Sequence, residues 1–477
     1  MSLRSLAFLL CCASTGFAQA IAPQIASRLT PENLKADVAF LASDTLQGRA
    51  TPSPGLDAAA EYIASEFRKA GLEPVGDDGY FQTATYNVVT PNMEGFEITC
   101  GAVRVTSGVI GEAVSTDLKN APVVKATPAE IDGLTAEQVR GKVLVVDQSA
   151  GRGFGGMRRW SSLSTLEPAL VLILYPDLPR AMGSRPALRD ASQPAPKFAA
   201  VIVSDPSLKE ALAKPDAAVS VRIPAPKIEI AKARNVAGLL RGSDPVLKDT
   251  YLIVTGHYDH LGVRGTGPGD HIFNGANDDA SGTSSVIEIA TALASLGERP
   301  RRSILFLTVF GEEVGGYGAR YYTTHPIFPL SQTIADLNLE QLGRTDDTEG
   351  PRPLQFNLTG FDYTDIAATL AKAGAETGIK VVKHEKNSDS FFSRSDNVTF
   401  ADAGIPDTTI SVAYIYPDYH AAGDEWPKLD YANMAKVDTC IALGLWNMAN
   451  SDQAPQWNRD NPKTARYLEA AKKLAGK

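Results

Sequence analysis

The chain has 477 residues, of which 44% are hydrophobic and 21% are charged, a composition typical of globular proteins with two or three domains. It carries 46 basic and 55 acidic residues, and the formal net charge of −9 disfavours nucleic acid as a partner. The same values exclude collagen-like and intrinsically disordered classes.

The first twenty residues have the pattern of a secretory signal peptide. Arg4 precedes a short apolar core over 6–12, and the small residues that follow predict cleavage after Ala20. This core is too short to span a bilayer, and no later segment has an uninterrupted apolar run of membrane-spanning length. We therefore expect an exported protein, periplasmic or secreted, with a signal peptide over 1–20 and no transmembrane segment.

Signal cleavage would leave only Cys100 and Cys440, which are far apart in the sequence and lack the spacing of metal ligands. An oxidising compartment would allow a disulfide between them. Two buried free thiols are the alternative that we favour, because free cysteine behaves as a small buried hydrophobe.

Residues 30–75 are predicted to be helical. Pro31 suits a helix start, and Ala59, Ile63 and Phe67 mark the buried face of a helix over about 57–70 that ends at Gly71. From 98 to 228 the pattern changes, because short β-like runs alternate there with loops rich in proline and glycine. This pattern predicts an inserted β-rich module.

From residue 229 to about 450, predicted strands alternate with predicted helices. The strand-like runs lie over 251–255, 303–310, 333–340 and 408–416. Such alternation predicts an α/β fold with a mostly parallel open sheet flanked by helices on both faces. We therefore expect one domain built from 21–97 and 229–450, an inserted domain over 98–228, and a polar tail over 451–477.

A glycine-rich stretch over 151–156, GRGFGG, matches the dinucleotide-binding pattern and follows a predicted strand. Four residues separate that strand from the first glycine, and no clear helical face follows. We interpret the stretch as a loop of the inserted module.

Histidine and carboxylate residues stand where the predicted strands end. A hydrolytic metal site needs such ligands from several strand ends, and also one carboxylate that takes a proton from water. Parallel sheets gather the carboxyl ends of their strands at one edge, where active sites form. The candidate ligands are His257, Asp278, Glu313, Glu340 and His420, with Glu312 left as the base.

Each of these residues also has a structural interpretation. His257 alone would be a hydrogen-bonded core histidine, and the pair Glu312 and Glu313 could form a solvated helix start. Acidic residues directly after a buried strand are costly without a partner, which favours the metal site. We interpret His260 as structural and leave open whether Asp424 orients His420 or caps a turn. The remaining histidines are predicted to be loop residues: His271, His325 and His384.

Six motifs occur in an order that resembles the M28 family of zinc peptidases. They are HYDHLG, NGANDDASG, GEEVGGYGAR, NLEQLGR, SDNVTFADAGIP and YHAAGDEW. With the flanking segments, the resemblance covers most of 30–85 and 230–445. The β-rich module, with GKVLVVD followed by ALVLILYPD, is similar to the protease-associated domain found in such enzymes.

The resemblance implies two zinc ions, or other divalent ions, bridged by Asp278. One ion would also bind His257 and Glu340, and the other would bind Glu313 and His420. Glu312 would be the general base, and Asp259 would fix the tautomer of His257. Many family members have Asp at the position of Glu340, and they commonly have a cis peptide after the bridging Asp, here Asp278-Asp279.

The implied activity is that of an aminopeptidase that removes N-terminal residues from peptides. A carboxypeptidase or dipeptidase of the same fold is the nearest alternative, and Arg344 or Arg394 could then contact a substrate carboxylate. A glutaminyl cyclase is disfavoured because the second metal position looks complete through His257. A non-catalytic, receptor-like protein would be expected to have lost ligands or the base, and all of them are present here.

Overall fold

The structure is a computed structural model, and it describes residues 21–148, 163–176, 186–192, 194–265 and 267–476. The chain forms two compact units. Unit 1 contains the residues up to 83 and from 234 onward, and unit 2 contains residues 84–233. The insertion predicted over 98–228 falls inside unit 2.

The sheet of unit 1 has a parallel centre. Its order is β21-β20-β22-β17-β13-β16-β12, in which β13 pairs in parallel with both β16 and β17, and β17 pairs in parallel with β22. Towards the edges, β12 is antiparallel to β16 and β20 is antiparallel to β22. The predicted α/β fold is confirmed. The strands are β12 (Lys227–Leu240), β13 (Tyr251–His257), β16 (Ser303–Val309), β17 (Thr333–Leu339), β20 (Gln355–Leu358), β21 (Lys380–Val382) and β22 (Asp407–Ser411).

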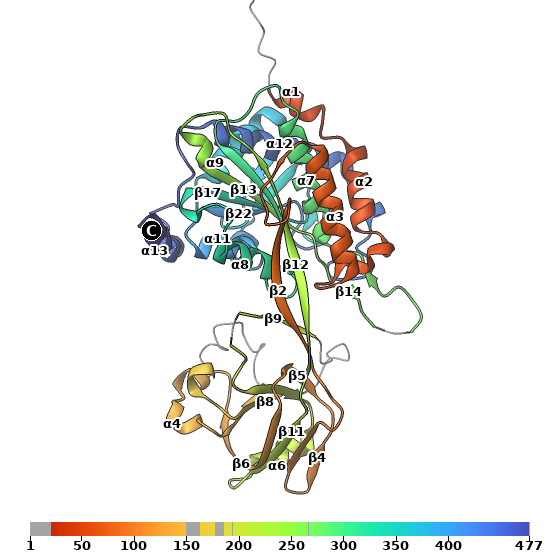
Figure 1. Cartoon of the computed structure of the whole chain (residues 1–477), viewed down its shortest axis with the longest axis vertical. Helices are drawn as coiled ribbons and strands as arrows, with labels where there is room; N and C mark the ends of the chain where they lie inside the picture. The colour runs from red at the N-terminus through yellow and green to blue at the C-terminus, as the bar shows by residue number, and fades with distance from the viewer. Residues whose placement is uncertain (1–20, 149–162, 177–185, 193, 266, 477) are drawn as a thin grey trace, which may run out of the picture. The chain divides into compact units, whose positions relative to one another are not determined.

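Helices cover both sides of this sheet (Figure 1). On one side α7 packs against β13, β16 and β17, and on the other side α8 packs against β16 while α11 packs against β17 and β22. Every residue of β13 and β16 is buried, which explains why these strands are continuous apolar runs rather than alternating ones. The helices are α7 (Gly282–Ala294), α8 (Tyr317–Thr324), α9 (Ile366–Thr377), α11 (Asn397–Asp402), α12 (Tyr431–Asn450) and α13 (Ala465–Ala475).

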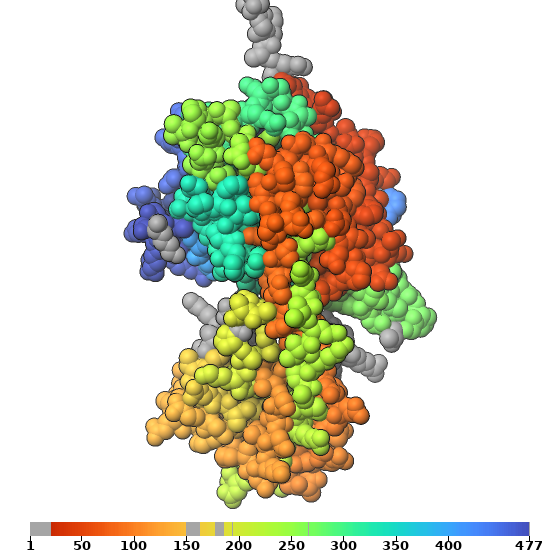
Figure 2. Space-filling model, viewed as in Figure 1, coloured from red at the N-terminus to blue at the C-terminus, as the bar shows by residue number. Residues whose placement is uncertain are grey.

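The N-terminal helices form part of the surface of unit 1, shown in red and orange in Figure 2. They are α2 (Pro31–Leu41) and α3 (Pro54–Lys69). Helix α3 confirms the helix predicted over 57–70, and the Ser53 hydroxyl caps its first turn by accepting from Leu56 N at 3.1 Å. Gly71 follows the helix with a φ of +75°, a conformation that glycine adopts without strain.

One predicted strand is shorter than expected. The apolar run over 408–416 was predicted to be a strand throughout, but β22 ends at Ser411. Val412 and Ala413 stay fully buried outside the sheet, whereas the side chain of Ile415 is 40% exposed. The apolar character of this run therefore indicated burial, which a packed loop satisfies as well as a strand does.

Unit 2 is rich in β-structure. Its eight-stranded sheet has the order β4-β3-β11-β6-β7-β8-β10-β5, and the pairs from β6 through β7 and β8 to β10 are parallel. The stretch GRGFGG lies outside the described residues. The strands are β3 (Glu97–Cys100), β4 (Val103–Val105), β5 (Val109–Glu112), β6 (Thr116–Ala126), β7 (Val143–Asp147), β8 (Leu170–Leu174), β10 (Ala199–Val203) and β11 (Ala218–Ile223).

Cys100 and Cys440 are both free and buried, which confirms the favoured alternative to a disulfide. Within the described ranges, no helix is long and apolar enough to cross a membrane. The predicted signal peptide over 1–20 lies outside these ranges.

Candidate metal centre

The strand order places a crevice at the carboxyl end of β13. The chain leaves β13 through α7 and reaches β16 on one side, and it then returns through α8 to β17 on the other side. Consecutive connections thus diverge at β13, and side chains at the carboxyl ends of neighbouring strands can converge on a ligand there. His257 is the last residue of β13, and Glu340 directly follows β17.

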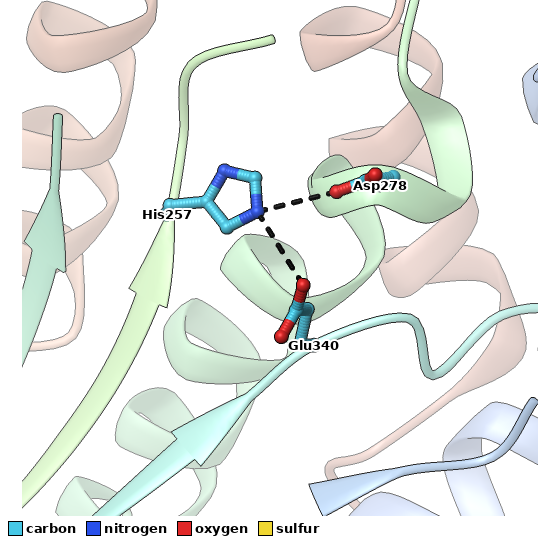
Figure 3. Close-up of side chains that lie close together, drawn as sticks. All are labelled: His257, Asp278 and Glu340. Atoms are coloured by element: carbon cyan, nitrogen blue, oxygen red, sulfur yellow. Dashed lines mark ion pairs between the residues drawn. The ribbon is translucent and has the colours of Figure 1, made fainter. Parts of the chain in front are cut away.

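Three predicted ligands meet at this point (Figure 3). His257 Nε2 lies 3.2 Å from Asp278 Oδ1 and 4.0 Å from Glu340 Oε1. The imidazole is only 1% exposed, so the group is shielded from bulk water. The structure thus brings together one histidine and two carboxylates from three separate segments of the chain.

A second group shares Asp278. His420 Nε2 lies 3.1 Å from Asp278 Oδ2 and 3.3 Å from Glu313 Oε1. The two oxygens of Asp278 therefore face different histidines, as a bridging carboxylate requires. The peptide bond between Asp278 and Asp279 is cis, which confirms that prediction.

His260 also belongs to this centre, although its sequence context was interpreted as structural. Its Nδ1 lies 2.8 Å from Glu313 Oε1, and its ring stands edge-on to the ring of His420 at 5.7 Å. Ligand atoms of His260, Asp278 and Glu313 all lie within 4.8 Å of one another. The only signal in the sequence was its position three residues after His257.

Asp259 lies behind His257 and next to Glu312. Its Oδ1 is 3.5 Å from His257 Nδ1, and the same atom accepts a hydrogen bond from Glu312 N at 3.1 Å. Asp259 is fully buried. One carboxylate thus contacts both the histidine at the end of β13 and the backbone that carries Glu312.

Asp424 contacts the loop that carries Asp278 rather than His420. Its carboxylate accepts hydrogen bonds from Asn277 N and Asp278 N, each at 3.0 Å, and from the Tyr416 hydroxyl at 2.9 Å. Burial is the main reason that the pKa of Asp424 is raised to about 6. Asp424 thus fixes the backbone position of Asp278.

Arg49 holds the opposite side of the same loop. Its guanidinium is fully buried and donates to the carbonyl oxygens of Tyr258 at 2.7 Å, Asn274 at 2.8 Å and Gly275 at 3.0 Å, and also to that of Leu41. Burial lowers the pKa of Arg49 to about 10. Nothing in the sequence around it indicated this role.

The two arginines considered for carboxylate recognition differ. Arg344 is 5% exposed and is paired with Asp346 at 2.6 Å and Asp418 at 2.9 Å, so its guanidinium is occupied within the chain. Arg394 instead lines a cavity of about 240 Å³ beside the centre. The cavity is lined by Asp278, Glu312, Glu340, Gln341, Thr359, Phe391, Arg394, Ser395, Thr409, Ser411, Tyr414, Ile415, Tyr419 and His420.

Burial dominates the electrostatics of the acidic residues. It raises the pKa of Glu312 well above the ordinary value and that of Glu340 to about 7. Burial acts on Asp278 in the same direction, but the adjacent imidazoles of His257 and His420 outweigh it and lower that pKa. Partial burial opposes the charge on His420, whereas the adjacent carboxylates of Asp278 and Glu313 raise its pKa to about 9.

The donor set fits a divalent metal ion. His257 Nε2, both ring nitrogens of His260 and Glu313 Oε1 are buried but make no hydrogen bond of good geometry within the described residues. Buried polar atoms without hydrogen bonds are rare and costly unless something else satisfies them. Imidazole nitrogen and carboxylate oxygen are ligands that zinc prefers. The residues present therefore fit zinc.

The sheet has a topological switch point, and histidine and carboxylate groups converge there. The chain is therefore an α/β protein with a candidate metal centre, and its residue types suit hydrolysis. Residues 235–444 match the sequence profile of Peptidase family M28. The chain carries a domain of this peptidase family.

The chain is also similar in sequence to a curated relative and in fold to solved structures. The chain is 27% identical over 281 residues to a probable zinc metalloprotease of Leptosphaeria maculans, and the match covers 50% of the chain and 61% of that relative. It resembles in fold an aminopeptidase from Aneurinibacillus sp. strain AM-1, with a TM-score of 0.63, 19% identity, and coverage of 89% of this chain and 95% of the other. A zinc aminopeptidase from Bacillus subtilis gives a TM-score of 0.55 at 17% identity, covering 88% of this chain and 95% of its own.

Proposed function

We propose that the protein is an exported zinc aminopeptidase that removes N-terminal residues from peptides. The observation that carries this proposal is the position of Asp278, whose two oxygens face His257 on one side and His420 on the other. Asp278, His257 and Glu340 would hold one ion, and Asp278, Glu313 and His420 would hold the other. Export rests on the signal-like pattern over 1–20.

When bound, two zinc ions in such a centre supply an activated water and polarise the scissile carbonyl. The role of Glu312 is to take the proton from the attacking water and to pass it to the leaving amine. Three observations support this role: Glu312 lines the cavity, belongs to neither group of converging ligand atoms, and has a pKa that burial raises. Asp259 orients His257 and fixes the backbone of Glu312.

The cavity supports attack at a chain end. Its volume of about 240 Å³ is below the range of about 300–1,000 Å³ that is typical of sites for larger ligands. A space of this size accommodates a side chain and its neighbouring peptide rather than a long segment.

The alternatives have less support. A carboxypeptidase or dipeptidase needs a cation for the terminal carboxylate. Arg344 is already occupied by Asp346 and Asp418, so that of the two candidate arginines only Arg394, in the cavity lining, is left for this role. A glutaminyl cyclase is disfavoured because His257, Asp278 and Glu340 form a second complete group. A non-catalytic receptor does not require a glutamate such as Glu312 in the cavity lining. The protease-associated identity of unit 2 stays a prediction.

Metal content and substrate blocking test the proposal together. The purified protein should bind close to two zinc ions per chain, and it should cleave aminoacyl 4-nitroanilides that have a free amine but not their N-acetylated forms. A chelator should abolish cleavage, and added zinc should restore it. Equal cleavage of free and blocked substrates would contradict the aminopeptidase, and cleavage that resists chelation would contradict the metal.

A further inference from the structure

One wall of the cavity is aromatic and carries a positive charge. The guanidinium of Arg394 lies 4.4 Å from the centre of the Phe391 ring, and that ring meets Tyr414 edge-on at 5.1 Å. All three residues line the cavity. Such a cation–aromatic contact holds the guanidinium over a fixed surface and leaves its edge free to donate hydrogen bonds.

No ion pair within the described residues neutralises the charge of Arg394. Among the ion pairs of the described residues, none involves Arg394, whereas Arg344 has two. An exposed arginine on most surfaces would only be solvated. Arg394 differs because its side chain lines the same cavity as Glu312 and Glu340.

The charge balance of the loaded centre favours an anionic substrate group. The two proposed zinc ions would offset the charge of the carboxylates that hold them or line the cavity, which are Asp278, Glu312, Glu313 and Glu340. Arg394 would then be the uncompensated charge of the lining. An anion in the cavity would meet a cation without opposition from those carboxylates.

We propose that Arg394 binds a carboxylate of the substrate, so that the enzyme prefers peptides with a carboxylate close to the scissile bond. This inference rests on the proposed aminopeptidase function and names its substrate class. The carboxylate has two possible sources, which are the side chain of an N-terminal Asp or Glu and the free C-terminus of a dipeptide. The planar, forked guanidinium matches either one in a bidentate contact.

Kinetics on the zinc-loaded full-length protein separate these sources. The first arm compares 4-nitroanilides of Glu and Gln, and the second compares a neutral dipeptide with its C-terminally amidated form. A charge-assisted contact of this kind predicts a preference in kcat/KM of about tenfold or more for the carboxylate form in one arm. The arm that shows the preference identifies the source.

Substitution assigns the preference to the residue. Arg394→Gln should remove the preference, measured as the ratio of kcat/KM between the two substrates of a pair, because a neutral side chain makes no charged contact there. Arg68→Gln is the matched control. Arg68 is also exposed and lies over an aromatic ring, 5.5 Å from the centre of Tyr80, but it does not line the cavity.

A binding measurement keeps this inference separate from the proposed function. By calorimetry, zinc-loaded Glu312→Gln protein should bind the anionic member of the favoured pair more tightly than its neutral analogue, and adding Arg394→Gln should abolish the difference. A wild-type enzyme without a carboxylate preference in either arm, or a preference that survives Arg394→Gln, would overturn the inference. A protein with no chelator-sensitive activity would instead contradict the proposed function, and the binding result would still decide the role of Arg394.

Discussion

The two units bury apolar strands in the same way but differ in the polar groups that they bury. In the described part of unit 2, Gln148 is the one polar side chain in the buried class. Unit 1 buries many, among them Arg49, His257, Asp259 and Asp278. Burying polar groups is costly unless they are paired. The concentration of such groups at one sheet edge therefore marks where unit 1 is built for chemistry.

The carboxylates that end or follow β7 and β16 show the same contrast locally. Asp147 ends β7, is 39% exposed and pairs with Lys209 at 3.0 Å. Glu313 follows β16, is 5% exposed and lies among histidines. An acidic residue after an apolar strand is therefore not a site by itself; burial and convergence with other ligands make the difference.

The largest effect is expected from a substitution of Glu312 in unit 1. Glu312→Gln should lower kcat by about a thousandfold and retain bound zinc, because only the proton acceptor is removed. Asp147→Asn, at the strand end of unit 2, is the matched control and should leave kcat unchanged. Metal analysis alongside steady-state kinetics checks both, and near-normal turnover in Glu312→Gln would show that another group is the base.

Asp278 comes next. Asp278→Asn should lower kcat/KM by about a hundredfold and reduce the zinc content, because an amide cannot supply two charged oxygens to His257 and His420 at once. Zinc content and kinetics are measured on the same preparation. Two tightly held ions in this variant would rule out a bridging role.

Arg49 in unit 1 and Arg140 in unit 2 allow a buried arginine to be compared with an exposed one. Arg49→Met should lower the free energy of unfolding of unit 1 by about 3 kcal/mol, because buried carbonyls would lose charge-assisted donors. Arg140→Met in unit 2, which removes an exposed ion pair with Glu167, should cost less than about 1 kcal/mol. Urea denaturation measures both, and equal losses would contradict the structural role of Arg49.

The smallest effect depends on pH and concerns Asp37, away from the metal centre. Burial raises its pKa to about 8, although the Tyr62 hydroxyl donates to it at 2.6 Å. In the unfolded chain this carboxyl has a pKa of ~3.9. The contribution of protonated Asp37 to the free energy of unfolding is therefore complete below that pH and is lost as the pH rises towards 8. Asp37→Asn removes this dependence.

The melting temperature of Asp37→Asn relative to wild type should therefore rise by on the order of a few degrees between pH 5 and pH 8. Thermal scans at both values measure it. Asp147→Asn, at a solvent-accessible carboxylate in unit 2, is the control. If the melting temperature of Asp37→Asn relative to wild type fell as the pH rose, the assigned direction of the Asp37 pKa shift would be contradicted.

The fold and much of the centre could be predicted because strand ends are visible in a sequence. His257, Glu313 and Glu340 follow apolar runs, and β13, β16 and β17 lie where those runs predicted. The short β22 could not be predicted, because Val412 and Ala413 are buried in a loop and apolar composition reports burial alone.

Contacts between distant segments of the chain could also not be predicted from the sequence. Arg49 binds carbonyls more than two hundred positions away, and Asp424 holds the backbone of Asp278 across 146 positions. His260 was interpreted as structural because its contact with Glu313 depends on how the loop after β13 folds. Such pairings depend on tertiary packing and leave no periodic signal.

The early end of β22 has a consequence for the two halves of the proposed centre. His257 sits on a rigid strand and is 1% exposed, whereas His420 lies on a loop beyond the strand, has a φ of +54° and is 35% exposed. Ligands on a solvated loop detach more readily than ligands on a packed strand. The ion beside His420 should therefore exchange with solvent faster, so that zinc scarcity would yield a half-loaded protein and a foreign divalent ion would enter at that position first.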